Sequence, residues 1–170
     1  MVRAVANTPV GATFDIETRA TSDHHAALRL WLRMLATTNV VEAAVRSGLK
    51  AQFNTTLPRF DLMAQLERAP DGLKMGELSR RMMVSGGNVT GITDLLEREG
   101  LVARIGDPDD RRALRVRLTA GGRKAFRAMA EAHERWIIHA LGSLDRAQMS
   151  QLNDLLGRIK SHVTAEKEKG

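Results

Sequence analysis

The segment from residue 75 to residue 122 constrains the fold most, because its hydrophobic period changes from helical to alternating and back again within one short stretch. The run "LKMGELSRRMMVSGGNVTGITDLLEREGLV" predicts two short helices, about 75–83 and 87–99, separated by a break at Val84 and Ser85 and closed by Gly100. Two short helices joined by a tight turn are typical of a helix-turn-helix unit.

Two strands around a charged turn are expected next. The words "LVARIG" and "ALRVRLT" fit strands, and the second alternates strictly between its two faces. One face carries Leu114, Val116 and Leu118, and the other carries Ala113, Arg115 and Arg117. The charged segment between the strands becomes the tip of a hairpin. A helix-turn-helix followed by such a hairpin predicts a winged helix-turn-helix, with the hairpin as its wing.

Amphipathic helices flank this centre on both sides. A helix from about 24 to 46 carries a broad apolar surface, and Pro58 suits the first turn of a further helix leading to "APDG". After the wing, two more helices are expected, and the last has the apolar spacing of a helix-pairing seam. Its apolar residues are Met149, Leu152, Leu156, Ile159 and Val163. Because one small winged domain cannot cover apolar stripes at both chain ends, we expect a homodimer.

The predicted fold class is therefore mainly α with a small β wing. Residues 1–22 are expected to form a flexible N-terminal arm, because they show no sustained helical or strand period. Residues 23–54 and 120–165 are assigned to a helical dimerisation region, and residues 55–119 to the winged helix-turn-helix domain. Within that domain the recognition helix is expected at about 86–99 and the wing at about 101–118.

The second helix of the motif offers a surface suited to the major groove of DNA. Its apolar residues Val89, Ile92, Leu95 and Leu96 are expected to hold it to the core. The outer side is then small or hydrogen-bonding, with Gly87, Asn88, Thr90, Gly91 and Asp94. Short polar groups on a closely approaching helix can reach base edges or phosphates, and an asparagine can bind adenine through two hydrogen bonds. An ordinary solvated face is the alternative.

Ser85 is expected to cap the start of this helix, where its hydroxyl would also meet a phosphate. A cap alone is the simpler interpretation. Gly86 and Gly87 have an alternative as well, since they could be turn residues required for the backbone conformation. In the wing, Arg111 and Arg112 stand at the hairpin tip, where long cations could enter a narrow minor groove.

Three acids complicate the wing tip, since carboxylates facing DNA are unfavourable unless they are paired. They are Asp107, Asp109 and Asp110. At least Asp110 is expected to hold an arginine in place. The expected DNA-contact set is Ser85, Gly87, Asn88, Thr90, Gly91, Arg111, Arg112 and Arg115.

Composition narrows the class of protein further. The chain of 170 residues has no cysteine and a net charge of +6, which excludes thiol chemistry and favours polyanionic partners. No metal site is expected, since no two histidines have the i, i+4 spacing of a helical metal site. The sequence contains no catalytic or cofactor-binding motif, so we expect neither an enzyme nor a bound cofactor. No apolar run could span a bilayer, so we expect a cytoplasmic protein without membrane partners.

The stretch "DPDDRRALRVRLTAGG" resembles the wing and following helix start of the MarR (multiple antibiotic resistance regulator) family. The shared pattern is Asp-Pro-x-Asp-x-Arg and then Val-x-Leu-Thr-x-x-Gly, filled by Asp107, Pro108, Asp110, Arg112, Val116, Leu118, Thr119 and Gly122. The resemblance implies a homodimer with intertwined terminal helices on a palindromic operator in double-stranded DNA, and usually repression relieved by a small ligand. It also implies that Asp110 and Arg112 pair at the wing tip, with the arginine in the minor groove.

The family commonly binds effectors between the dimerisation helices and the winged domain. Here an apolar crevice could be formed by Trp31, Phe60 and Met63, with His25 or Arg59 as a polar group for a carboxylate. Each is also a reasonable core or surface residue. The words "LRLWLRML" and "TLPRFDLMAQLERAPDG" are similar to the branch that controls catabolism of aromatic compounds, which implies a small aromatic acid or an aromatic acyl-CoA as effector.

The sequence therefore predicts a sequence-specific, ligand-responsive transcription regulator, with repression as the expected sign. Two alternatives stay open. One is a non-specific, architectural DNA-binding protein, which would bind operator and random duplex alike with a steep salt dependence. The other is a winged-helix module that binds proteins, although such a module could dispense with the arginine tip.

Overall fold

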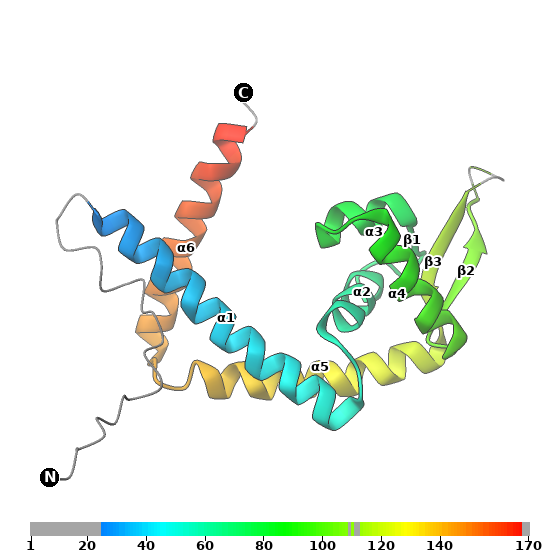
Figure 1. The fold of residues 1–170 in the computed structure, drawn as a ribbon, viewed down its shortest axis with the longest axis horizontal. Coiled ribbons are helices and arrows are strands. Elements are labelled where there is room, and N and C mark those ends of the chain that lie inside the picture. Colours follow the sequence, from blue (N-terminus) through cyan, green and yellow to red (C-terminus); the bar gives the residue numbers. More distant parts are fainter. Residues whose placement is uncertain (1–24, 109, 111–112, 168–170) are drawn as a thin grey trace, which may run out of the picture. The chain divides into compact units, whose positions relative to one another are not determined.

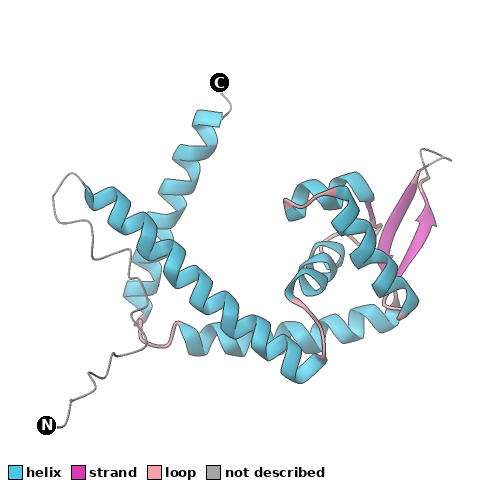
Figure 2. Ribbon diagram, viewed as in Figure 1, coloured by secondary structure: helices cyan, strands magenta, loops and turns pink. Residues whose placement is uncertain are grey.

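A computed structural model describes residues 25–108, 110 and 113–167. Six helices and three short strands follow one another in these residues, and the helices dominate (Figures 1 and 2). The chain divides after Ala43 into two compact units, and the boundary lies within the first helix. The predicted arm at 1–22 lies outside the described residues. No helix among the described residues is long and apolar enough to cross a membrane.

The first helix, α1 (Ala26–Phe53), is longer than the sequence predicted. We expected it to end near residue 46, before Gly48. The prediction was wrong because Gly48 serves packing instead: an added Cβ would lie 2.7 Å from the Trp136 ring. The glycine lets that indole approach the helix closely. The helix ends instead before Asn54, whose φ of 47° turns the backbone into the left-handed region.

The winged domain contains the predicted elements in the predicted order. Helix α2 (Leu57–Glu67) has Pro58 in its first turn as expected and is followed by α3 (Met75–Met82) and α4 (Gly86–Arg98). Strands β2 (Val102–Gly106) and β3 (Leu114–Leu118) form the antiparallel hairpin of the wing. The two last helices are α5 (Ala120–Ala140) and α6 (Arg146–Lys167).

A third strand, β1 (Leu73–Lys74), was not predicted. It pairs antiparallel with β3, so that the sheet has the order β1-β3-β2 and β3 lies at its centre. Two residues are too few to show an alternating period, which is why the sequence pattern missed this strand. Its effect is to fix the start of α3 directly to the wing.

The core lies where α2, α4 and α5 meet the sheet. It is formed by buried aliphatic side chains and by Phe60, which stacks on Phe126 at 5.4 Å between ring centroids. The ring of His133 lies 5.0 Å from that of Phe60, so this histidine packs at the interface between α2 and α5. On the central strand, Val116 and Leu118 are buried, but Leu114 on the same face is 51% exposed. It lies at the tip end of the hairpin, opposite Gly106.

Candidate nucleic-acid interface

The recognition helix α4 begins with a well-defined cap. The Ser85 hydroxyl accepts a hydrogen bond from the backbone N–H of Asn88 at 3.5 Å, as the sequence predicted. The backbone of Ser85 is extended, with φ −64° and ψ 151°, so the helix starts sharply at Gly86. The first turn therefore presents its remaining N–H groups at an exposed helix end, which is a favourable place for a phosphate.

The buried side of α4 contains the predicted residues, except that Thr93 takes the place of Leu95. Val89 and Leu96 are fully buried and Ile92 is half-buried, but Leu95 is 43% exposed and does not hold the helix to the core. Thr93 takes that place with no exposed surface. It can be buried because its hydroxyl donates to the Val89 carbonyl at 2.8 Å, which leaves its methyl group for packing.

The outer side of α4 is exposed and carries mostly glycine and small polar side chains. Gly87, Asn88, Thr90 and Gly91 are all exposed, together with Gly86 at the helix start. The Thr90 hydroxyl donates to the Gly86 carbonyl at 2.9 Å, so it remains available to a partner mainly as an acceptor. We call the five residues Gly86, Gly87, Asn88, Thr90 and Gly91 the glycine face.

Nothing inside the domain requires glycine at these positions. A Cβ added at Gly86, Gly87 or Gly91 would meet no atom within 4 Å outside the helix's own backbone. Their φ angles are not positive either, since only Gly72 and Gly100 have positive φ among the described glycines. The interpretation of Gly86 and Gly87 as turn residues was therefore wrong. Glycine is unfavourable within a helix, so three of them on one exposed face indicate that a partner approaches closely.

An ion-pair network holds α4 against the wing. The guanidinium of Arg104 on β2 contacts the carboxylates of Asp94 and Glu97 on α4, and the Arg104 backbone N–H donates to Glu97 at 3.2 Å. The hydrogen bond to Asp94, together with both negative charges, raises the pKa of Arg104 although burial opposes the rise. Sequence reasoning missed this network and placed Asp94 on the outer side of the helix only. The Asp94 carboxylate pairs with Arg104 and so helps to fix the distance between α4 and the wing.

A second network fixes the base of the wing. Asp107 is buried and accepts from Arg115 Nε at 2.7 Å, forms an ion pair with Lys74 Nζ at 3.2 Å, and accepts from the backbone N–H of Asp110 at 3.0 Å. This carboxylate therefore joins β1, β3 and the turn. Arg115 was predicted to contact DNA, but the structure places its Nε on Asp107 and leaves the side chain 26% exposed. The neighbouring outward residue Arg117 is exposed.

The two tip arginines, Arg111 and Arg112, lie outside the described residues, so their predicted minor-groove contacts and the pairing of Arg112 with Asp110 stay predictions. Asp110 itself is exposed, and its carbonyl accepts from the Ala113 N–H at 2.9 Å, which closes the turn. The hairpin of β2 and β3 lies beside α4, which β2 contacts (Figure 1).

The residues predicted to bind an effector separate into two groups. His25 and Trp31 lie in the N-terminal unit, where both are exposed. Phe60 and Met63 both belong to the core, and Met63 also lines, together with Arg59, a pocket of about 370 Å³ in the compact unit that begins at Ala44. The pocket is also lined by Phe53, Asn54, Thr55, Glu99, Leu101, Ala125, Ala128 and Met129. Among the described residues, no cluster of histidines and carboxylates could hold a metal ion.

Arg59 is the polar centre of this pocket. One guanidinium nitrogen pairs with the carboxylate of Glu99, the C-cap residue of α4. Its Nε is buried and donates to no acceptor in the part of the chain that the structure describes. A buried donor without a partner is unfavourable, so this atom is well suited to an anionic ligand.

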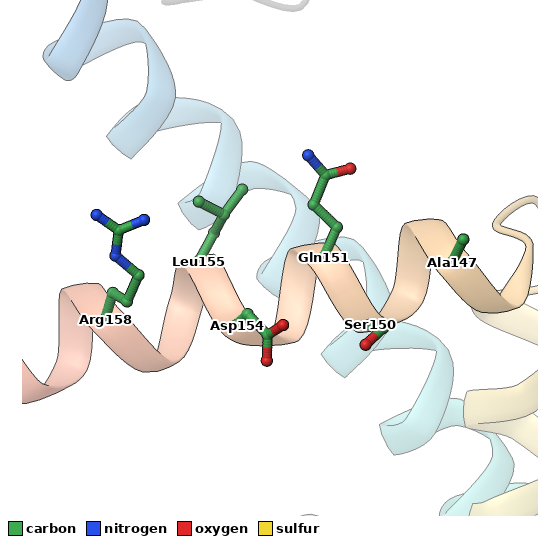
Figure 3. Close-up of a pocket in the computed structure, with 6 residues that line it drawn as sticks. All are labelled: Ala147, Ser150, Gln151, Asp154, Leu155 and Arg158. Atoms are coloured by element: carbon green, nitrogen blue, oxygen red, sulfur yellow. The ribbon is translucent and has the colours of Figure 1, made fainter.

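The last helix carries a surface of a different kind. All residues of α6 from 146 to 166 are exposed, including the apolar Met149, Leu152, Leu155, Leu156, Ile159 and Val163. A shallow pocket along this helix is lined by Leu155 with the polar Ser150, Gln151, Asp154 and Arg158 (Figure 3). So large an apolar surface on one helix is typical of an interface with another chain.

Comparison with known proteins agrees with this architecture. A family model described as the MarR family matches residues 53–113. The transcriptional activatory protein BadR of Rhodopseudomonas palustris is 32% identical over 107 residues, which cover 62% of this chain and 61% of BadR. A MarR family regulator from Silicibacter pomeroyi is 31% identical with a TM-score of 0.71, and the match covers 84% of this chain and 99% of that structure.

The fold is also found in a regulator solved together with DNA. A mutant of MarR from Escherichia coli, complexed with operator DNA, has a TM-score of 0.69 to this chain at 19% identity. The match covers 82% of this chain and 99% of that one.

Proposed function

Because the chain belongs to the MarR family of transcription regulators, we propose that it binds a palindromic operator in double-stranded DNA as a homodimer and acts as a ligand-responsive repressor in the cytoplasm. Its class is that of a regulator and not of an enzyme. The observation that carries the proposal is the glycine face of α4, which is exposed, helical and without any internal need for glycine.

The glycine face fits a major groove for steric and chemical reasons. Without side chains at three positions, the backbone of α4 can come close to base edges, and the Asn88 amide then offers both a donor and an acceptor. The capped N-terminus directs partial positive charge at the same place, where a phosphate would neutralise it. The two ion-pair networks hold the helix and the wing at one spacing, so that both can engage neighbouring grooves.

Dimerisation supplies the second half of the interface. We propose that the apolar surface of α6 packs against the same helix region of a second copy, since it is exposed along its whole described length. Two recognition helices related by a two-fold axis must lie about 34 Å apart to read successive major grooves. A palindromic operator follows from this symmetry.

Asn88→Ala tests the base-reading role. We expect the variant to keep its fold and its affinity for random duplex, but to lose its preference at one position in each half-site, because the bidentate contact to an adenine is gone. The operator is first obtained by selecting bound sequences from random duplexes. Gln52→Ala, which removes an exposed amide from α1, is the matched control and should select the wild-type operator. Unchanged discrimination by the Asn88 variant would refute the role.

The effector site is proposed at the pocket around Arg59. A carboxylate could bind the buried Nε, while Met63, Phe53 and Met129 provide an apolar wall. The volume of about 370 Å³ suits a small aromatic acid, or only the acyl part of an aromatic acyl-CoA. Because Glu99 at the end of α4 shares the same guanidinium, a ligand that draws Arg59 away can change the position of the recognition helix. Ligand binding would then favour one arrangement over the other.

A thermal-shift screen of aromatic acids and their CoA esters tests this site. A ligand that raises the unfolding temperature of the wild type should have a much smaller effect on Arg59→Gln. Arg68→Gln changes an exposed arginine at the end of α2 and should respond as the wild type does. An equal response of the Arg59 variant would place the ligand elsewhere. A reporter gene placed under the selected operator shows whether the protein represses or activates. For a repressor, we expect higher reporter expression when the protein is absent.

A further inference from the structure

The turn between α3 and α4 contains an unusual residue. Met83 has a φ of 55° and a ψ of 36°, which is the left-handed conformation that favours glycine or asparagine. The residue is 93% exposed, whereas no other large apolar residue in the described part of the chain exceeds the 71% of Val40. The position therefore combines two unfavourable features, backbone strain and an apolar side chain in water.

The fold does not depend on the side chain of Met83. The turn is held by main-chain groups, since the Met83 N–H donates to the Arg80 carbonyl at 3.3 Å and the Val84 N–H donates to the Ser79 carbonyl at 3.2 Å. The Ser79 hydroxyl also donates to the Val84 carbonyl at 2.6 Å. Glycine would satisfy this geometry without strain. A strained residue on a rigid turn is a feature from which function can be inferred.

We propose that Met83 is a specificity-determining residue that reads a thymine at the edge of each half-site. It precedes the Ser85 cap by two positions, so it stands beside the N-terminal end of the glycine face. The only apolar group on a base edge in the major groove is the C5-methyl of thymine. The long, unbranched and polarisable side chain of methionine adapts well to such a contact. The inference rests on the proposed function and adds a residue that the sequence pattern did not select.

Two substitutions separate the side chain from the strain. Met83→Gly removes both, whereas Met83→Ala removes the side chain and keeps a left-handed residue with a Cβ. We expect only the glycine variant to unfold at a higher temperature, by about 2–4 °C. Both variants should bind the selected operator about 10-fold more weakly than the wild type, while their affinity for random duplex is unchanged. Fluorescence anisotropy measures the affinities.

Replacing operator thymines one at a time by uracil removes single C5-methyl groups and tests the contact itself. The wild type should lose affinity at one thymine in each half-site, and Met83→Ala should show no further loss there. Operator affinity equal to that of the wild type, a loss shared equally by random duplex, or equal uracil effects in both proteins would each overturn the inference. If the wild type shows no preference among duplexes, both the proposed function and the inference about Met83 are wrong.

Discussion

Gly91→Ala adds one methyl group to the glycine face, and its two expected effects have opposite signs. Gly91 lies inside α4, its φ is not positive, and an added Cβ meets no atom within 4 Å outside the helix backbone. The free protein should therefore accept alanine without strain. Alanine is about 1 kcal/mol more favourable than glycine within a helix, which corresponds to a rise of roughly 2–4 °C in unfolding temperature for a chain of this size.

On DNA the same methyl group should be harmful. If α4 approaches the groove as closely as its bare face suggests, the methyl group occupies space that base edges need. Overpacking of a close contact costs about 1–3 kcal/mol, and 1.4 kcal/mol is a tenfold change in affinity. We expect operator affinity to fall roughly 10-fold or more for each half-site. A variant that is more stable and yet binds less well distinguishes this mechanism from simple misfolding.

Circular dichroism melting and fluorescence anisotropy with the selected operator measure the two effects. Gly121→Ala is the matched control, because it adds a methyl group to an exposed glycine of α5, where the nearest atom is Thr119 Oγ1 at 3.7 Å. It should leave operator affinity unchanged. The reasoning is refuted if Gly91→Ala is stabilised as expected and still binds the operator as tightly as the wild type.

Further variants test the wing, the packing and the dimer. Asp107→Ala removes the carboxylate that joins Lys74, Arg115 and the turn, and should lower the free energy of unfolding by about 2–3 kcal/mol, less than for a fully buried pair because both cations reach solvent. Gly122→Ala places a Cβ in collision with the Leu101 carbonyl oxygen, so the free energy of unfolding measured with denaturant should fall by about 3 kcal/mol. Leu156→Glu on α6 should give monomers by light scattering, and a persistent dimer would exclude this surface as the interface.

Most of the fold could be predicted because its signals are local. The hydrophobic periods located α3, α4 and the wing to within a residue or two, and Pro58 marked the start of α2. The errors arose where packing overrode a local rule. The first helix was expected to end near residue 46, but Gly48 lies inside α1 and makes room for Trp136.

The face of α4 shows the same limit. Leu95 was assigned to the core from the helical spacing of the apolar residues, yet Thr93 is buried instead, because its hydroxyl donates to the Val89 carbonyl. No periodicity records such a bond. The sequence correctly selected Ser85 as the cap and predicted that Gly87, Asn88, Thr90 and Gly91 face outward.

Long-range pairs could not be predicted at all. Arg59 and Glu99 are 40 residues apart, and Arg104 meets Asp94 and Glu97 only because β2 runs back along α4. Charges in these positions look like ordinary surface residues in the sequence. Their partners depend on how the elements pack in three dimensions, which no local pattern records.

The central claim is that two copies of α4 read two half-sites on one duplex. The most direct measurement is a selection of bound sequences from random duplexes, followed by the mass of the complex formed with the enriched sequence. The account predicts an inverted repeat with half-site centres about 10 base pairs apart, bound by two chains. Enrichment of no sequence, or a complex that contains a single chain, would contradict it.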